Sequence, residues 1–144
     1  MTNEDFSSQG VFYCKDAGEK FLEAESVDLF IGHPPYYMAE PELNGGDPTK
    51  QLQNANTTTD YYQGLLDAIL HMEYALKPNG HIFLALDNSP GGLEIISRAL
   101  VSSSLRIQSI RLWDPPQYLS SPDPVATVVF VHLAKYDCSP ELLR

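Results

Sequence analysis

Short apolar runs alternate along this chain with longer amphipathic ones, and that alternation limits the folds open to it. Runs with strand-like composition occupy residues 11–14, 27–31, 82–86, 105–113 and 125–134. Helical spacing of apolar residues marks 17–24, 60–76 and 91–102. Strands that alternate with helices are typical of an α/β domain with a mostly parallel sheet. Because a turn-rich segment without a helix joins the last two strands, we expect them to close the sheet as an antiparallel hairpin.

The expected helices have inward faces, and the longest has marked ends. Thr58, Thr59 or Asp60 can cap the helix over 60–76, and Lys77-Pro78-Asn79-Gly80 stops it. The positions expected to face inward are Phe21 and Leu22 in the first helix, Tyr62, Leu65, Leu66, Ile69, Leu70 and Leu76 in the second, and Leu93, Ile96, Ala99 and Leu100 in the third. The run over 27–31 is apolar apart from Asp28, which favours a buried parallel strand.

Length and composition favour one domain in a reducing compartment. The 144 residues suffice for a single core, so we expect one domain over 1–144, with a flexible N-terminus over 1–10 and a mobile loop over 38–58. Cys14 and Cys138 lack metal-ligand spacing, and we interpret them as reduced thiols. The start is polar and acidic, and no apolar run approaches the roughly 20 residues that span a bilayer. The sequence therefore predicts a cytoplasmic protein without membrane contact.

The net charge of -10 argues against tight, independent binding of a nucleic acid. Nucleic-acid binders usually carry a basic patch, because neutralising phosphates supplies much of their affinity. Here nine Lys and Arg residues are spread along the chain without a cluster. Contact with DNA would therefore need a partner chain or a local pocket. The simpler interpretation is that the acidity serves solubility.

The clearest chemical feature is the way the run over 27–31 ends, in Gly32-His33-Pro34-Pro35-Tyr36-Tyr37. In open parallel sheets, ligands bind beyond the carboxyl ends of the strands. Two prolines stiffen the backbone, so its carbonyl oxygens point in fixed directions. Such acceptors suit an exocyclic amine of a base, and Tyr36 offers a flat face for stacking an extruded base.

This segment resembles the catalytic motif of DNA amino-methyltransferases, in which Asp, Asn or Ser precedes Pro-Pro and an aromatic residue. The flanks are similar to the family as well, in Tyr13-Cys14-Lys15-Asp16 before the motif and in the stretch from Ala75 to Leu84, which looks like the family's Leu-Lys-Pro-Gly-Gly turn and following strand. The resemblance covers residues 11–135. It implies a partial Rossmann-like class I methyltransferase sheet, with S-adenosylmethionine as the methyl donor and adenine N6 or cytosine N4 as the target.

The resemblance also assigns site residues. His33, Pro34, Pro35 and Tyr36 fall at the catalytic motif. Asp16 falls where the family often has an acidic residue near the cofactor adenine. Asp87 is a second cofactor-site candidate on its position rather than on the resemblance, since it follows the strand over 82–86 beside the same cleft, and the alternative is that it only begins the next turn.

Two features depart from the family pattern. A glycine-rich loop directly after a strand is absent, and neither Gly45-Gly46 nor Gly91-Gly92 replaces it. The motif precedes that missing element, as in a permuted branch of the family, and 139–144 resembles the segment just before the loop. His33 stands where Asp, Asn or Ser is expected. A neutral imidazole accepts through one nitrogen and a charged one through none, so His33 is either an altered acceptor or a drifted site.

Other candidates favour structural interpretations. Asp114-Pro115-Pro116-Gln117-Tyr118 looks like a second motif copy but is interpreted as a turn. His71, His81 and His132 lack partner spacing and are interpreted as packing or surface residues rather than metal ligands. Tyr61 and Tyr62 are expected in the core, which leaves Tyr36 as the stacking candidate.

Two functions remain open. One is a methyltransferase whose cofactor loop comes from a partner chain. The other is a non-catalytic relative, kept as a binding or regulatory subunit or as an accessory protein of a virus or mobile element. We also expect the strand over 27–31 to have an open edge, covered by the strand over 11–14 or by self-association of the chain.

Overall fold

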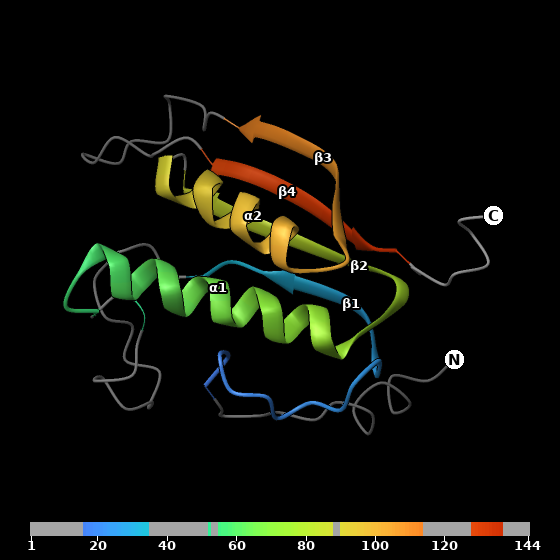
Figure 1. The fold of residues 1–144 in the computed structure, drawn as a ribbon. Coiled ribbons are helices and arrows are strands. Elements are labelled where there is room, and N and C mark those ends of the chain that lie inside the picture. The colour runs from blue at the N-terminus through green and yellow to red at the C-terminus, as the bar shows by residue number, and fades with distance from the viewer. Residues whose placement is uncertain (1–15, 35–51, 53–54, 88–89, 114–127, 137–144) are drawn as a thin grey trace, which may run out of the picture.

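Four strands form one sheet and two helices lie on one side of it in the part of the chain that the computed structural model describes, residues 16–34, 52, 55–87, 90–113 and 128–136 (Figure 1). In chain order the elements are β1 (Val27–Gly32), α1 (Thr58–Ala75), β2 (Leu76–Asp87), α2 (Pro90–Ser102), β3 (Leu105–Trp113) and β4 (Val128–Lys135). The expected α/β class is confirmed. The expected strand over 11–14 and nearly all of the expected loop over 38–58 lie outside the described residues.

The expectation of a mostly parallel sheet is wrong, because the sheet is mixed. Its strand order is β1-β2-β4-β3. Among the strands that the structure describes, only β1 and β2 pair in parallel, whereas β4 is antiparallel to both of its neighbours, β2 and β3. The last strand thus inserts between β2 and β3 instead of adding at the edge. The antiparallel pairing of the last two strands is as expected.

Helix α1 is fixed at both ends by side chains. Thr57, one residue before the predicted caps, accepts a hydrogen bond at Oγ1 from the Asp60 backbone N–H at 3.1 Å. At the other end, the Lys135 ammonium group donates to the carbonyl oxygens of Glu73 at 3.0 Å and Leu76 at 2.9 Å. These carbonyls lack helical partners, so a cation from β4 satisfies them and favours the negative end of the helix dipole.

The core lies between the helices and one face of the sheet. The residues of this core are Leu65, Ile69, Leu76, Ile82, Leu84, Leu86, Ile95, Ile96, Ala99, Leu105, Val129, Val131 and Leu133. On β2 and β4 they occupy every second position, as the pleat of a strand requires. The prediction for α2 was partly wrong, because Leu93 is 43% exposed and Ile95 is buried instead.

The segment before β1 is not the helix expected over 17–24. It forms turns, in which the Asp16 carboxylate accepts from the Gly18 N–H at 2.9 Å and the Glu19 N–H donates to the Asp16 carbonyl oxygen at 3.1 Å. An Asp side chain that captures a backbone donor two residues later competes with helix formation. The segment packs on α1 through His71, whose Nδ1 lies 3.0 Å from the Ala17 carbonyl oxygen and whose ring meets that of Phe21 edge-on.

Strand β1 was expected to be buried, and it is not. It lies at one edge of the sheet in the described residues, with Leu29 49% and Ile31 79% exposed. A short apolar run is compatible both with a strand that is buried on two faces and with one whose outward side chains are exposed. Composition alone therefore did not distinguish a buried β1 from an exposed one.

We call the side of the sheet that faces away from α1 and α2 the outer face. Side chains of directly paired residues point to the same side of a sheet. The pairs Ile31–Phe83, Arg111–Phe130 and Trp113–Val128 therefore lie on the outer face, opposite to the buried positions of β2 and β4. No helix in the described ranges has both the length and the apolar composition needed to cross a membrane.

Candidate functional site

The carboxyl ends of three strands meet at one edge of the sheet. Asp87, the last residue of β2, and Trp113, the last of β3, both pair with Val128, the first residue of β4. Gly32 ends β1 beside Leu84 of β2, and His33 follows directly. The chain therefore places the start of the predicted motif at the edge where ligands of α/β sheets usually bind.

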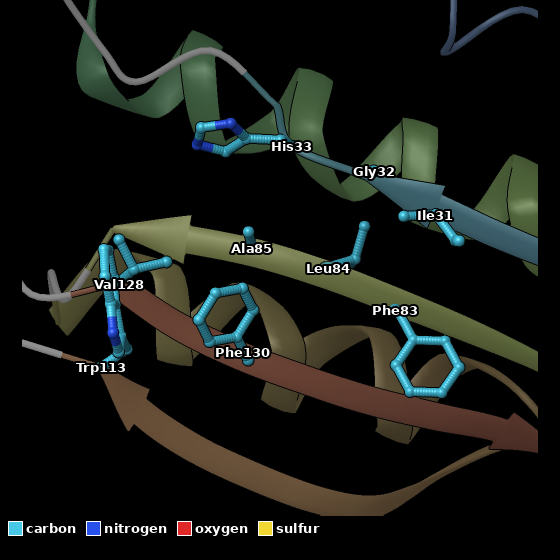
Figure 2. A pocket seen from close by; sticks show the side chains of 9 residues that line it. All are labelled: Ile31, Gly32, His33, Phe83, Leu84, Ala85, Trp113, Val128 and Phe130. Carbon is cyan, nitrogen blue, oxygen red and sulfur yellow. The ribbon is translucent and has the colours of Figure 1, made fainter. Parts of the chain in front are cut away.

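A hollow of about 520 Å³ opens on the outer face next to this edge (Figure 2). Its lining residues are Ile31, Gly32, His33, Phe83, Leu84, Ala85, Trp113, Val128 and Phe130. The rings of Phe83, Phe130 and Trp113 come from three different strands, and His33 stands at the end of β1. Most of the wall is apolar and aromatic, so the hollow suits a flat, weakly polar ligand.

The glycine before the motif has a packing role. A Cβ atom at Gly32 would lie 3.0 Å from Cδ2 of Leu84, a distance that real Cβ contacts rarely reach. A side chain here would require the end of the Leu84 side chain to shift by a few tenths of an ångström. Gly32 therefore lets Leu84 pack closely against the end of β1, one residue before His33 at the hollow.

The structure brings together only part of the predicted site. His33 lines the hollow and is exposed, and Pro34 is half-buried. Pro35 and Tyr36 lie outside the described residues, as does the second motif copy over 114–118. The Asp87 backbone ends β2 at the same edge of the sheet. Asp16 does not line the hollow, and the residue next to it, Ala17, contacts α1 at His71.

Phe83 and Phe130 are the site residues that the sequence analysis missed. Each stands between two buried residues, Phe83 between Ile82 and Leu84 and Phe130 between Val129 and Val131. A strand with one face in water normally alternates apolar and polar residues. In both strands an apolar residue, Phe83 or Phe130, takes the position where a polar residue is expected. This break in the alternation was the sequence signal for aromatic side chains on the outer face.

Two histidines that the sequence left unpaired meet on the outer face. His81 Nδ1 lies 3.0 Å from His132 Nε2, and the ring of Phe83 stacks on that of His132 at 4.1 Å between centroids. Burial, with the neighbouring His81 as the second cause, lowers the pKa of His132 below its usual value. Among the described residues, no group of three or more side chains could hold a metal ion. The two histidines therefore have no third described ligand beside them.

The described residues do not form a site for S-adenosylmethionine on their own. That cofactor carries a sulfonium, an ammonium and a carboxylate group, and burying such charges requires polar partners. The wall of the hollow is mostly apolar, and the Asp16 carboxylate, already bonded to Gly18, lies elsewhere. A cofactor site would need residues beyond those the structure describes.

Comparison with solved structures places the fold. A protein of Thermus thermophilus assigned as a DNA modification methylase matches with a TM-score of 0.57 and 14% identity, over 85% of this chain and 51% of that one. Its complex with S-adenosyl-L-methionine matches at 0.54 and 13%, over 86% and 54%. A SAM-dependent methyltransferase from Methanosarcina mazei matches at 0.54 and 9%, over 85% and 65%.

These likenesses show a methyltransferase-like fold, and at such low identity they show the fold alone. The sequence matches no protein-family model and no curated protein. The chain spans about half the length of the Thermus protein. Its mixed sheet, with an aromatic hollow at the carboxyl ends of its strands, is thus part of a methyltransferase-like fold.

Proposed function

We propose that this chain is the target-base part of an S-adenosylmethionine-dependent DNA amino-methyltransferase, and that a polypeptide segment outside this sequence supplies the cofactor loop. One observation supports this above all. In a methyltransferase-like fold, His33-Pro34 leaves β1 directly beside a hollow walled by aromatic rings. The absence of a glycine-rich loop in the sequence and the apolar wall of the hollow are the reasons for placing the cofactor site elsewhere.

The residues of the hollow have separate roles in this proposal. An extruded adenine or cytosine is planar, and it stacks on Phe83, Phe130 or Trp113, which gives affinity without choosing between bases. Selectivity for an amine then falls to His33. In its neutral form, one ring nitrogen accepts a hydrogen atom of the exocyclic amine.

The first test is titration of the full chain with nucleosides, followed by NMR. Deoxyadenosine and deoxycytidine carry an exocyclic amine, and thymidine does not. We expect the first two to shift the signals of the hollow and thymidine to shift them less. Phe130→Ala is expected to weaken binding about five- to hundred-fold, the range for losing one stacked base. Leu93→Ala, on α2, is the control and should bind as the unchanged chain does. Unchanged spectra with every nucleoside at millimolar concentration would refute the base site.

The second test separates the cofactor assignment from the base site. We expect calorimetry with S-adenosylmethionine and S-adenosylhomocysteine to show no binding by this chain at millimolar ligand. Micromolar binding would contradict the proposal that the cofactor loop lies outside the sequence. It would leave the base site standing and make methyl transfer by His33→Asp the next measurement.

A second candidate function is a non-catalytic methyltransferase-fold subunit that binds nucleic acid or regulates a partner. The observation that favours it is His33 itself, in place of the acidic or amide acceptor of the resembling family. If His33→Asp raises nucleoside affinity but no transfer to DNA follows in any reconstituted mixture with S-adenosylmethionine, this second function is favoured.

A further inference from the structure

The outer face exposes large apolar side chains from all four strands. Leu29 and Ile31 come from β1, Phe83 from β2, Phe130 from β4 and Trp113 from β3. Their exposed fractions are 49%, 79%, 43%, 46% and 45%. When one face of a sheet is in contact with water, the outward positions of its strands usually carry polar side chains. This face therefore has the composition of a covered surface.

The charge of this face differs from that of the whole chain. The chain carries 19 acidic residues against nine basic ones. By register, the charged residues at outer-face positions include Arg106 and Arg111, paired with Ala134 and Phe130 on β4, and Asp87, whose backbone pairs with Val128. Two copies with a net charge of -10 each repel at long range, and salt at physiological concentration screens this repulsion.

The apolar area is sufficient for a stable contact between proteins. A large side chain has roughly 150–250 Å² to bury, so the five exposed fractions leave on the order of 500 Å² of apolar surface in water. A standard interface buries about 800 Å² on each partner, of which about 60% is apolar. The outer face thus supplies about the apolar share that one side of such an interface needs.

We propose that the outer face binds a second copy of this chain, and that two outer faces pack against each other as stacked sheets. Such a dimer is isologous, because the same patch serves on both subunits. Stacked sheets lie about 10 Å apart, a spacing that outward Phe and Ile side chains fill. The hollow opens on the same face and shares Ile31, Phe83, Phe130 and Trp113 with it, so the second copy would cover the hollow, and dimerisation would compete with base binding. This inference goes beyond the proposed function and does not depend on it.

The test is sedimentation velocity of the full chain over roughly 1–200 µM in about 0.15 M salt, where the Debye length of about 8 Å screens the net charge. We expect a species of twice the 16.0 kDa chain mass at the upper concentrations. Ile31→Lys and Leu29→Lys each place a cation on the outer face and should raise the dimer dissociation constant at least tenfold. Because both side chains are half-exposed or more, circular dichroism should show an unchanged fold.

Val101→Lys is the matched control. Val101 is β-branched like Ile31 and 88% exposed, but it lies on α2, on the opposite side of the sheet. It should leave the dimer intact. A chain that stays monomeric at 200 µM, or a dimer that survives both outer-face variants, or one lost equally in Val101→Lys, would overturn the inference. Nucleoside binding by a strictly monomeric chain would overturn it while leaving the proposed function in place.

Discussion

At the residue scale, the chemistry of this chain depends on side chains whose partners are remote in sequence. His81 and His132 are 51 positions apart and yet 3.0 Å apart at their ring nitrogens. His33 follows β1 and lines the hollow together with Phe83, Phe130 and Trp113, which come from the three other strands. The resemblance of 33–36 to a catalytic motif is visible in the sequence because these residues are contiguous, and it stays a prediction. Phe83, Phe130 and the histidine pair could not be recognised there, because sheet register, which places them, is a non-local property.

The histidine pair predicts a pH dependence. Burial first, and the charge of His81 second, lower the pKa of His132 from 6.5. Between that lowered value and 6.5 the unfolded chain binds more protons than the folded one. The contribution of His132 to stability is therefore present at neutral pH and is lost as the pH falls below about 6.5. NMR titration of the ring carbons should give a midpoint below 6.5 for His132, and His81→Asn should move that midpoint upward. A midpoint above 6.5 in the unchanged chain contradicts this assignment.

At the element scale, the periodicity of apolar residues predicted where helices and strands form better than it predicted which of their side chains are buried. The bounds of β3 were predicted correctly and those of α2 to within one residue, because these elements are regular and end at clear signals. The helix expected over 17–24 was wrong, because the segment forms turns instead, beginning with the bond from the Gly18 N–H to the Asp16 carboxylate that apolar spacing does not reveal. The open edge of β1 was expected, but the exposure of Leu29 and Ile31 was missed, since an apolar run does not show which of its side chains are covered.

The N-terminus of α1 allows a prediction at this scale. Thr57 accepts from the Asp60 N–H, and its own hydroxyl donates to the Asp60 carboxylate at 2.8 Å. Thr57→Ala removes both bonds and should lower the free energy of unfolding by about 1 kcal/mol, the usual cost of losing an N-cap. Thr59→Ala, also in an exposed first-turn position, is the control and should change it far less. Chemical denaturation measures both, and equal losses would show that Thr57 is not the cap.

At the scale of the whole molecule, strand order was the property least accessible to sequence reasoning. The antiparallel pairing of β3 with β4 was expected, but the insertion of β4 between β2 and β3 was not. That insertion carries Phe130 into the middle of the outer face and brings Lys135 to the end of α1. The position of β4 between β2 and β3 thus determines which side chains line the hollow and the outer face, and it supplies the cation at the C-terminal end of α1.

The charge of the whole molecule predicts how a nucleic acid can reach the hollow. With a net charge of -10, the surface repels a duplex, and few phosphate contacts are available to release counterions. We therefore expect fluorescence anisotropy to show no binding of a 20-base-pair duplex by this chain at about 100 µM protein, with no gain when salt is lowered from about 200 to 50 mM. Nucleosides, which carry no phosphate, escape this repulsion and should still bind the hollow. Micromolar affinity for the duplex, rising steeply as salt is lowered, would mean that a basic surface exists beyond the described residues and that the chain contacts DNA without a partner.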